Sequence, residues 1–214
     1  MPRGVFISLD GLDGTGKSTQ CQLLAERLRR TDLSVTTCTD PGGTELGAKL
    51  REILLFGREI GMGATAEALL FMASRAELVE RVIRPAILAG HIVISDRYTL
   101  ANVVYQGHAG GLNPDDIWKV GKITTEGLYP SLTLVLDLPV EMAAVRRGRA
   151  ADRLESRGAD YHQRVRDGFL IEARSDSERI KVIDASLSVE VVQQKIWNEV
   201  RELLRSRGFK SVGA

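Results

Sequence analysis

A glycine-rich segment near the N-terminus limits what this chain can fold into more than any other feature. Residues 11–18 read GLDGTGKS and fit the pattern G-x-x-x-x-G-K-[S/T] at every fixed position. The segment follows an apolar run at residues 5–9 and precedes residues with helical spacing. Glycines there let backbone N–H groups face a phosphate, and the helix start adds its positive dipole end. The predicted phosphate-binding residues are Gly11, Leu12, Asp13, Gly14, Thr15, Gly16, Lys17, Ser18 and Thr19.

Two side chains of this loop have the chemistry of a nucleoside triphosphate site. Lys17 supplies a positive charge for the β and γ phosphates, and the Ser18 hydroxyl suits a Mg²⁺ ion that bridges them. Two aspartates, Asp96 and Asp137, follow apolar runs and offer an acid at the end of a strand. The N-K-x-D motif of GTPases is absent from the sequence, so a GTPase is disfavoured.

Short apolar runs alternate with longer segments of helical spacing along the chain. These runs cover residues 5–9, 33–37, 91–95, 132–136 and 180–183. Their near-continuous apolar character is typical of parallel strands that are covered on both faces. Strand followed by helix, repeated, predicts an α/β fold with a doubly wound parallel sheet.

The composition limits the classes of protein to which this chain can belong. The 214 residues, of which 43% are hydrophobic and 27% charged, suit one globular domain over residues 1–214. A net charge of +1 gives no sign of a protein that binds nucleic acid or an anionic membrane. No apolar run approaches the ~20 residues that cross a bilayer, and two cysteines match no metal or disulfide pattern, so we expect a cytoplasmic protein.

An arginine-rich stretch at residues 146–166 does not follow the alternation of predicted strands and helices. It holds seven arginines against three acidic residues and has few apolar side chains. Charge runs of this kind are usually solvated surface. By itself the stretch predicts a mobile excursion from the sheet.

Several separated motifs together resemble the thymidylate kinase family over nearly the whole chain. They are LDGLDGTGKST at 9–19, DPGGT at 40–44, LLFMASR at 69–75, SDRY at 95–98, YQG at 105–107, DRLE at 152–155 and RVRDGFL at 164–170. The resemblance implies transfer of the ATP γ-phosphoryl group to dTMP, giving dTDP and ADP, with Mg²⁺ as cofactor. It also implies a P-loop NTPase fold with a five-stranded parallel sheet of order 2-3-1-4-5 flanked by helices, a lid at about 146–160, and a homodimer through long helices including residues 64–88.

The resemblance assigns the base-binding side chains first. It implies that Phe71 stacks on the thymine and that Arg75 bonds the base edge. These two residues are one helical turn apart and therefore share a face. Asn102 and Gln106 are candidates for further edge contacts, because stacking alone discriminates bases weakly.

The sugar and phosphate groups of the acceptor are assigned in the same way. The resemblance implies that Arg97 binds the dTMP phosphate and that Asp96 lies near the reacting phosphates and the metal. Asp13 resembles the acid that reaches the deoxyribose 3′-hydroxyl, and Tyr105 is expected to close over the sugar.

The catalytic arginine is expected from the lid. Some members of the family carry a basic residue in the phosphate loop, whereas this chain has Gly14 there and resembles the lid-arginine type. A lid arginine stabilises charge on the transferring phosphoryl group. Arg153 is the first choice, Arg149 the second and Arg147 the third.

One departure from the family pattern concerns the segment before the second helix. It commonly reads R-E-P-G-G-T, but here Thr39 and Asp40 replace the first two residues. Any contact that the missing arginine made is therefore expected to be absent or to be made by another cation, with Lys49 and Arg51 as the candidates.

Two other functions remain open from the sequence. One is a kinase for another nucleoside monophosphate or a deoxynucleoside. The other is a catalytically inactive nucleotide-binding regulatory protein. The motifs favour direct in-line transfer, because no Ser, Cys or His resembles an activated nucleophile and an ionised acceptor phosphate needs no strong base.

Overall fold

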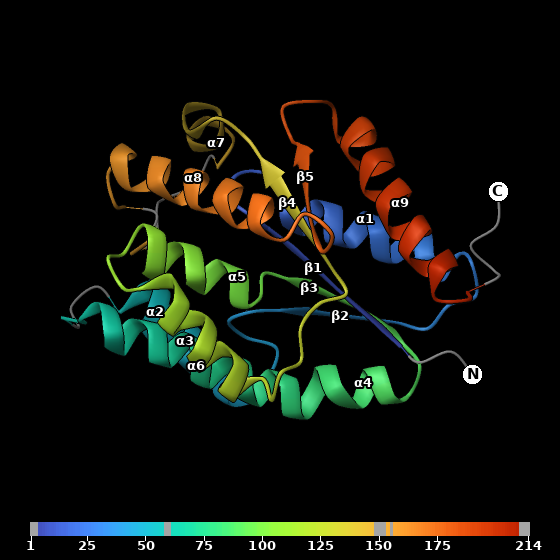
Figure 1. Ribbon diagram of the computed structural model, residues 1–214, viewed down its shortest axis with the longest axis horizontal. Helices are drawn as coiled ribbons and strands as arrows, with labels where there is room; N and C mark the ends of the chain where they lie inside the picture. The colour runs from blue at the N-terminus through green and yellow to red at the C-terminus, as the bar shows by residue number, and fades with distance from the viewer. Residues whose placement is uncertain (1–3, 58–60, 148–152, 155, 210–214) are drawn as a thin grey trace.

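The computed structural model of the chain describes residues 4–57, 61–147, 153–154 and 156–209 (Figure 1). Within them, parallel strands form one five-stranded sheet in the order β2-β3-β1-β4-β5. The strands are β1 (Val5–Gly11), β2 (Val35–Thr39), β3 (Ile92–Asp96), β4 (Leu132–Asp137) and β5 (Ile180–Asp184). The predicted fold class and strand order are therefore confirmed.

Burial explains the sequences of the strands. The inner strands β1, β3 and β4 are buried almost throughout, which is why they are mainly apolar. The edge strand β2 is only half-buried and reads VTTCT. It begins at Val35, paired with Ile92, and not at Leu33 as the apolar run predicted. Leu33 instead packs against the core from the preceding loop.

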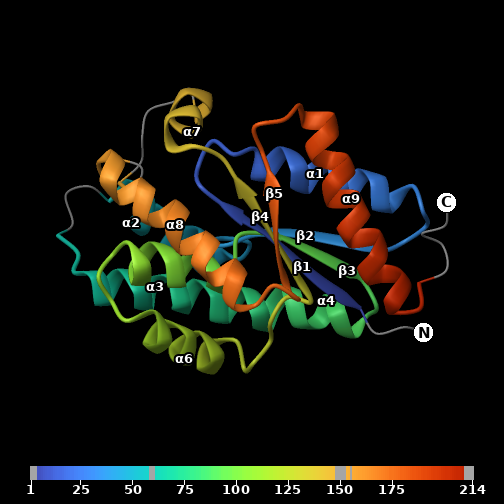
Figure 2. The same ribbon diagram turned by 45° about the horizontal axis from the view of Figure 1, so that its top comes forward.

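Helices cover both faces of the sheet. They are α1 (Lys17–Arg29), α2 (Glu45–Phe56), α3 (Ala64–Leu78), α4 (Arg84–Leu88), α5 (Thr99–Asn102), α6 (Pro114–Thr124), α7 (Val140–Arg147), α8 (Ala159–Ser175) and α9 (Val189–Ser206). Figures 1 and 2 place α1 and α9 on one side of the sheet and α3 and α4 on the other. This arrangement leaves the carboxyl ends of the strands open at one edge.

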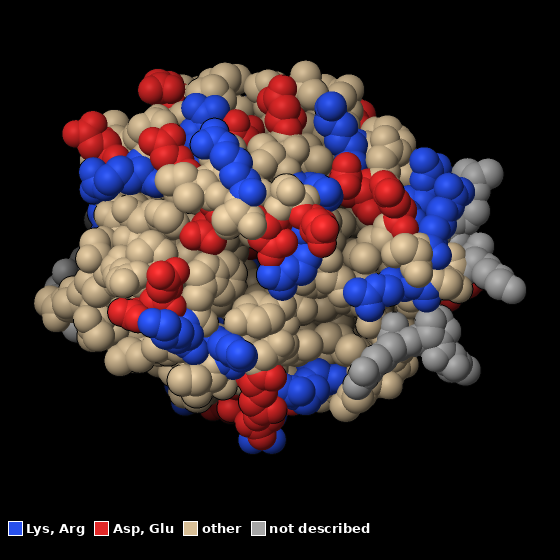
Figure 3. Space-filling model, in the orientation of Figure 1, with Lys and Arg blue, Asp and Glu red and all other residues tan. Residues whose placement is uncertain are grey.

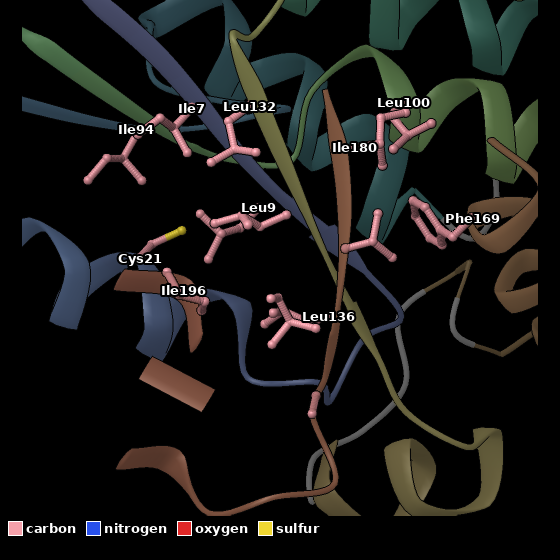
Figure 4. Close-up of a cluster of buried hydrophobic side chains, with 14 of the residues drawn as sticks. Ile7, Leu9, Cys21, Ile94, Leu100, Leu132, Leu136, Phe169, Ile180 and Ile196 are labelled. Atoms are coloured by element: carbon pink, nitrogen blue, oxygen red, sulfur yellow. The ribbon is translucent and has the colours of Figure 1, made fainter. Parts of the chain in front are cut away.

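The main core lies between the sheet and its covering helices. Figure 4 shows Leu9 of β1 close to Cys21 of α1 and Ile196 of α9. Phe169 of α8 belongs to the same buried cluster and lies farther along the sheet, near Leu100 (Figure 4). The core therefore ties the phosphate-binding loop, which lies between β1 and α1, to the rest of the fold.

Two π-helical turns interrupt the helical segments. Residues 64–88, predicted as one helix, form α3, a π-helical turn η1 (Val79–Ile83) and α4. The irregular turn stands just before Pro85, which has no N–H to donate and whose ring crowds the preceding turn. A second π-helical turn, η2 (Val103–His108), follows α5 directly. Such turns recur at functional sites, and η2 carries Tyr105 and Gln106.

The surface shows no concentration of one charge on the face in view. Figure 3 shows basic and acidic side chains interspersed over it, which agrees with the small net charge of +1. Among the residues that the structure describes, no helix is both long and apolar enough to cross a membrane.

Candidate functional site

A cavity of about 350 Å³ opens at the carboxyl ends of β1, β2 and β3. The predicted site residues that line it are Asp13, Gly14, Gly16, Lys17, Ser18, Thr19, Phe71, Arg75, Asp96, Arg97, Asn102, Tyr105 and Gln106. They come from three parts of the chain that are far apart in sequence, residues 13–19, 71–75 and 96–106. The cavity therefore joins the phosphate-binding loop to the groups expected to bind an acceptor.

The backbone of the phosphate-binding loop requires glycine at two positions. Gly11 and Gly14 have φ values of +132° and +91°. A Cβ at Gly14 would also lie 2.2 Å from the carbonyl oxygen of Ala143 in α7. A side chain at this position would therefore require the backbone at Ala143 to move.

Lys17 lies inside the loop with its ammonium group directed back at the chain. Its Nζ donates to the carbonyl oxygen of Leu12 at 2.7 Å and lies 3.7 Å from an Asp13 oxygen. Burial lowers the pKa of Lys17, and the nearby Arg97 lowers it further, while Asp13 and other acids oppose both. A phosphate entering the loop would give this buried cation an anionic partner.

Ser18 and Asp96 bring two oxygen ligands together from different elements. The Ser18 hydroxyl donates to Asp96 Oδ2 at 2.6 Å. Mg²⁺ is usually held by one or two protein oxygens, with phosphates and water completing its shell. The described residues contain no group of three or more His, Cys, Asp or Glu side chains suited to a metal, so this pair fits only an ion that phosphates also hold.

Arg97, just after β3, contacts the phosphate-binding loop at two points. Its Nη1 donates to the carbonyl oxygen of Gly11 at 2.9 Å, and its Nη2 donates to Asp13 Oδ1 at 2.7 Å. The Tyr105 hydroxyl donates to Asp13 Oδ2 at 3.3 Å. Burial would raise the pKa of Asp13, but Arg97 and Lys17 outweigh it and hold this pKa far below its usual range. Asp13 is therefore a carboxylate with two close partners.

Arg75 is fully occupied by protein acceptors. Only 1% of the residue is exposed, and its Nε donates to Asp40 Oδ2 at 2.5 Å. Its Nη2 donates to Asn102 Oδ1 at 2.6 Å, and the guanidinium lies over the ring of Tyr98. Burial raises the pKa of Asp40 in spite of this arginine. Asp40 thus replaces the usual glutamate as the acid that holds Arg75.

Phe71 belongs to a small apolar cluster at the cavity wall. It packs with Leu54, Leu55 and Leu154, and 7% of it is exposed. Leu55 and Leu154 also line the cavity, although neither was singled out in the sequence. Phe71 is therefore both a member of a packed apolar cluster and a residue that lines the cavity.

The predicted lid arginines lie in different places. Arg147, at the end of α7, lines the cavity. Arg153 does not; its Nε donates to the carbonyl oxygen of Leu54 at 2.8 Å and its Nη2 lies 2.6 Å from Glu67 Oε2. Arg149 lies outside the described residues.

The structure distinguishes between Arg51 and Lys49, the two candidates to replace the arginine that is missing at position 39. Arg51 lines the cavity and donates from Nη1 to the carbonyl oxygen of Pro41 at 2.8 Å. Lys49 forms an exposed pair with Glu45 on α2. Arg51 is thus the cation that reaches the cavity.

Sequence reasoning missed Glu67, a buried acid on α3 with 1% of its surface exposed. It accepts hydrogen bonds from Gln106, Arg153 and Arg157. A signal was present, because positions 67, 71 and 75 lie one turn apart on one helical face. An acid that shares a face with Phe71 and Arg75 is expected beside the same site, and Glu67 lies there behind Gln106, although it does not line the cavity itself.

Asp10, next to the loop, is buried without a hydrogen-bond partner among the described residues. Burial is the main cause that raises its pKa from 3.8 to about 7, against the opposing charges of Arg97 and Lys17. A raised pKa means that the folded state binds a proton that the unfolded state releases. The stability that this proton gives is therefore lost as the pH rises from about 4 to about 7.

We expect Asp10→Asn, a neutral side chain of the same shape, to remove this loss. Between pH 5 and pH 8 the free energy of unfolding should fall by about 2–3 kcal/mol more in the parent protein than in the variant. Urea unfolding of the nucleotide-free protein at several pH values measures this. The exposed Asp115→Asn serves as the control, and parallel pH profiles for the parent and Asp10→Asn would contradict the assignment.

Comparison with known proteins identifies relatives of the chain. The family model described as thymidylate kinase matches residues 9–196. A thymidylate kinase of Symbiobacterium thermophilum is 46% identical over 210 residues, which cover 98% of this chain and 98% of the relative. Another, of Rhodopirellula baltica, is 48% identical over 193 residues, covering 90% and 78%. The crystal structure of thymidylate kinase from Ehrlichia chaffeensis superposes with a TM-score of 0.77 at 28% identity, covering 94% of this chain and 99% of that one.

Proposed function

The chain belongs to the thymidylate kinase family, and from this premise we propose how its own residues carry out the transfer. The protein is an ATP-dependent phosphotransferase that acts on dTMP. The relatives support this function over a kinase for another nucleotide and over an inactive regulatory protein. The observation that carries the assignment of roles is the shared cavity, which Lys17 of the phosphate-binding loop and Arg75, Arg97 and Phe71 of the acceptor side all line.

The thymine end of the acceptor lies, in this proposal, between Phe71 and the polar groups of α3, α5 and η2. Phe71 supplies a ring for stacking at the cavity wall. Asn102 and Gln106 each retain hydrogen-bonding capacity beyond the contacts that they make with one another and with their neighbours. Because Arg75 is occupied by Asp40 and Asn102, its main part is to hold Asn102 in place, and this modifies the direct base contact that the resemblance implied.

The sugar and phosphate of dTMP then meet Asp13, Tyr105 and Arg97. The Asp13 carboxylate accepts a hydrogen bond from the 3′-hydroxyl and repels a phosphate at that position. Arg97 binds the 5′-phosphate, with Arg51 as a second cation on the other side of the cavity. This orientation directs the 5′-phosphate toward the loop that holds ATP.

The donor phosphates occupy the loop, and Lys17 exchanges its bond to the Leu12 carbonyl for a phosphate oxygen. We propose Ser18 and Asp96 as the residues that hold Mg²⁺ together with the ATP phosphates, and the short contact between their oxygens supports the pairing. The ion would neutralise charge on the transferring group. Positioning and electrostatics supply the rate, since the acceptor phosphate is already a nucleophile.

The lid supplies the arginine that acts on the transition state. Arg147 lines the cavity, whereas Arg153 is paired with Glu67 and does not line it. Both remain in the proposal, together with Arg149. The loop has glycine at position 14 and so offers no cation there, which favours the lid as the source.

The function is tested by ADP formation from ATP and Mg²⁺ with a panel of acceptors. We expect strong preference for dTMP over dUMP, dCMP, dGMP, AMP and thymidine. Background rates with every acceptor, from a protein that still binds ATP, would contradict the proposal.

Replacement of the loop lysine tests the donor site. Lys17→Met should lower kcat about 100-fold or more, because a preorganised cation on the developing charge is removed. The matched control is Lys195→Met, a change of an exposed lysine on α9. A near-normal kcat for Lys17→Met would remove Lys17 from the proposed machinery.

We also propose a homodimer through the layer of α2, α3 and α6. Large apolar side chains are exposed there: Leu46, Ile53 and Phe56 on α2, Leu69 on α3 and Ile123 on α6. The layer is continuous, because α3 contacts both α2 and α6. Exposed apolar area of this kind marks interaction surfaces.

A charge in this layer should separate the subunits. Leu69→Arg is expected to elute as a monomer in size-exclusion chromatography with light scattering, whereas Leu88→Arg, at an exposed leucine on α4, keeps the dimer. A parent protein that is monomeric at micromolar concentration would rule the dimer out.

The two cysteines, Cys21 and Cys38, are free thiols. Reduced thiols suit the cytoplasm, where we propose that the protein acts.

A further inference from the structure

Glu67 occupies an unusual position for a carboxylate. It lies on α3 with 1% of its surface exposed, and both of its oxygens are engaged. Oε1 accepts from Gln106 Nε2 at 2.9 Å. Oε2 lies 2.6 Å from Arg153 Nη2 and 2.8 Å from Arg157 Nη2. One acid thus contacts the base-binding side on one oxygen and two lid arginines on the other.

The hydrogen bonds that lead to Glu67 run in one direction. Arg75, which can only donate, faces Asn102 Oδ1, so the Asn102 amide nitrogen is turned to Gln106 Oε1 at 2.9 Å. Gln106 therefore presents its own nitrogen to Glu67, which as a carboxylate only accepts. The arginine at one end and the carboxylate at the other fix both amides against a flip. Arg75 and Glu67 therefore determine which polar atoms Asn102 and Gln106 present to a base.

The lid arginines that contact Glu67 also contact residues near it, in α2 and α8. The backbone N–H of Arg153 donates to the carbonyl oxygen of Leu55 in α2 at 3.1 Å. Arg157 Nη1 donates to the Tyr161 hydroxyl at 3.0 Å, and that hydroxyl donates to the Tyr105 carbonyl oxygen in η2 at 2.8 Å. The described lid residues are therefore held against α2, α3 and η2 around one buried acid.

Docking of the lid arginines depends on the negative charge of Glu67. A single buried carboxylate faces two guanidinium groups, and its removal would leave two like charges beside each other at a site with little water. The cost of burying the acid is offset only while the lid arginines are present.

We propose that Glu67 is a positioning residue that couples occupation of the base site to docking of the lid. The proposal rests on the assignment of Asn102 and Gln106 to the thymine end of the cavity. A base that bonds to these two amides further restrains the motion of Gln106, the donor to Glu67, so the lid docks with less loss of conformational freedom. Coupling is reciprocal, so a docked lid tightens dTMP binding by the same factor.

Hydrogen exchange at the Arg153 backbone amide measures this coupling directly, because that amide bonds to α2 only when the lid is docked. Exchange is followed by mass spectrometry with and without saturating dTMP, in the parent protein, Glu67→Gln and the control Glu77→Gln. Glu77 lies on the same helix and pairs with Arg81 away from the cavity. We expect dTMP to slow exchange about fivefold or more in the parent and the control, and less than about twofold in Glu67→Gln.

Two results would overturn the proposal. One is equal slowing by dTMP in Glu67→Gln and the parent, because phosphate contacts alone would then place the lid. The other is faster exchange throughout α3 of Glu67→Gln without dTMP, to the same extent as at Arg153, because the acid would then only stabilise the helix.

A variant on the lid side covers the case in which Glu67→Gln does not fold. Arg157→Gln changes a partly exposed side chain that contacts Glu67 from the other direction. It should weaken the dTMP effect at the Arg153 amide while the thermal unfolding midpoint stays unchanged. An undiminished dTMP effect in Arg157→Gln would count against Glu67 as the coupling residue.

Kinetics on the same proteins separate this proposal from the proposed function. Glu67→Gln should raise KM for dTMP and lower kcat, with KM for ATP unchanged. An equal rise in both KM values would contradict a role at the base end. Absence of dTMP turnover in the parent protein would instead contradict the proposed function.

Discussion

The site depends on a partly buried contact between two strand ends, the ion pair of Asp13 and Arg97. Asp13 belongs to the loop after β1 and Arg97 follows β3, two strands that are neighbours in the sheet. The pair is largely shielded from water, with 27% and 15% of the two side chains exposed. Breaking such a pair leaves an uncompensated charge, which is far more unfavourable than breaking an exposed one. The contact fixes the donor loop relative to the acceptor side before either nucleotide binds.

Other cations around the cavity are also held by protein groups before a nucleotide binds. Three cations of the site are already held by protein acceptors: Lys17 by the Leu12 carbonyl, Arg97 by Asp13 and Arg75 by Asp40. Positive charge is thereby kept in place without collapsing the cavity. Incoming phosphates then meet donors whose positions cost little further ordering, which is the condition for electrostatic catalysis. In the proposed mechanism the lid adds a further positive charge, and Glu67 couples docking of the lid to the base site.

The sequence predicted the parts of the site that depend on local chain geometry. The loop pattern fixed the positions of Lys17 and Ser18, and helical spacing placed Phe71 and Arg75 on one face. The strand order and most acceptor residues came from family resemblance, not from periodicity. The limits of β2 were wrong by two residues, because apolar character does not distinguish an edge strand from the loop that packs beside it.

Other features could not be read from the sequence, because they are set by partners distant along the chain. Nothing near Arg153 indicates that it contacts Glu67, 86 residues away. The π-helical turn that carries Tyr105 and Gln106 has no local signature either. Burial of Asp10 and occupation of Arg75 by Asp40 likewise appear only when the strand ends come together.

The central claim is that one cavity holds both nucleotides, with their phosphates meeting between Lys17 and Arg97. The most direct measurement is calorimetric titration with a molecule in which a polyphosphate chain joins the 5′ positions of thymidine and adenosine. The account predicts one molecule bound per chain and competition with both ATP and dTMP. Competition with only one of the two nucleotides would contradict it.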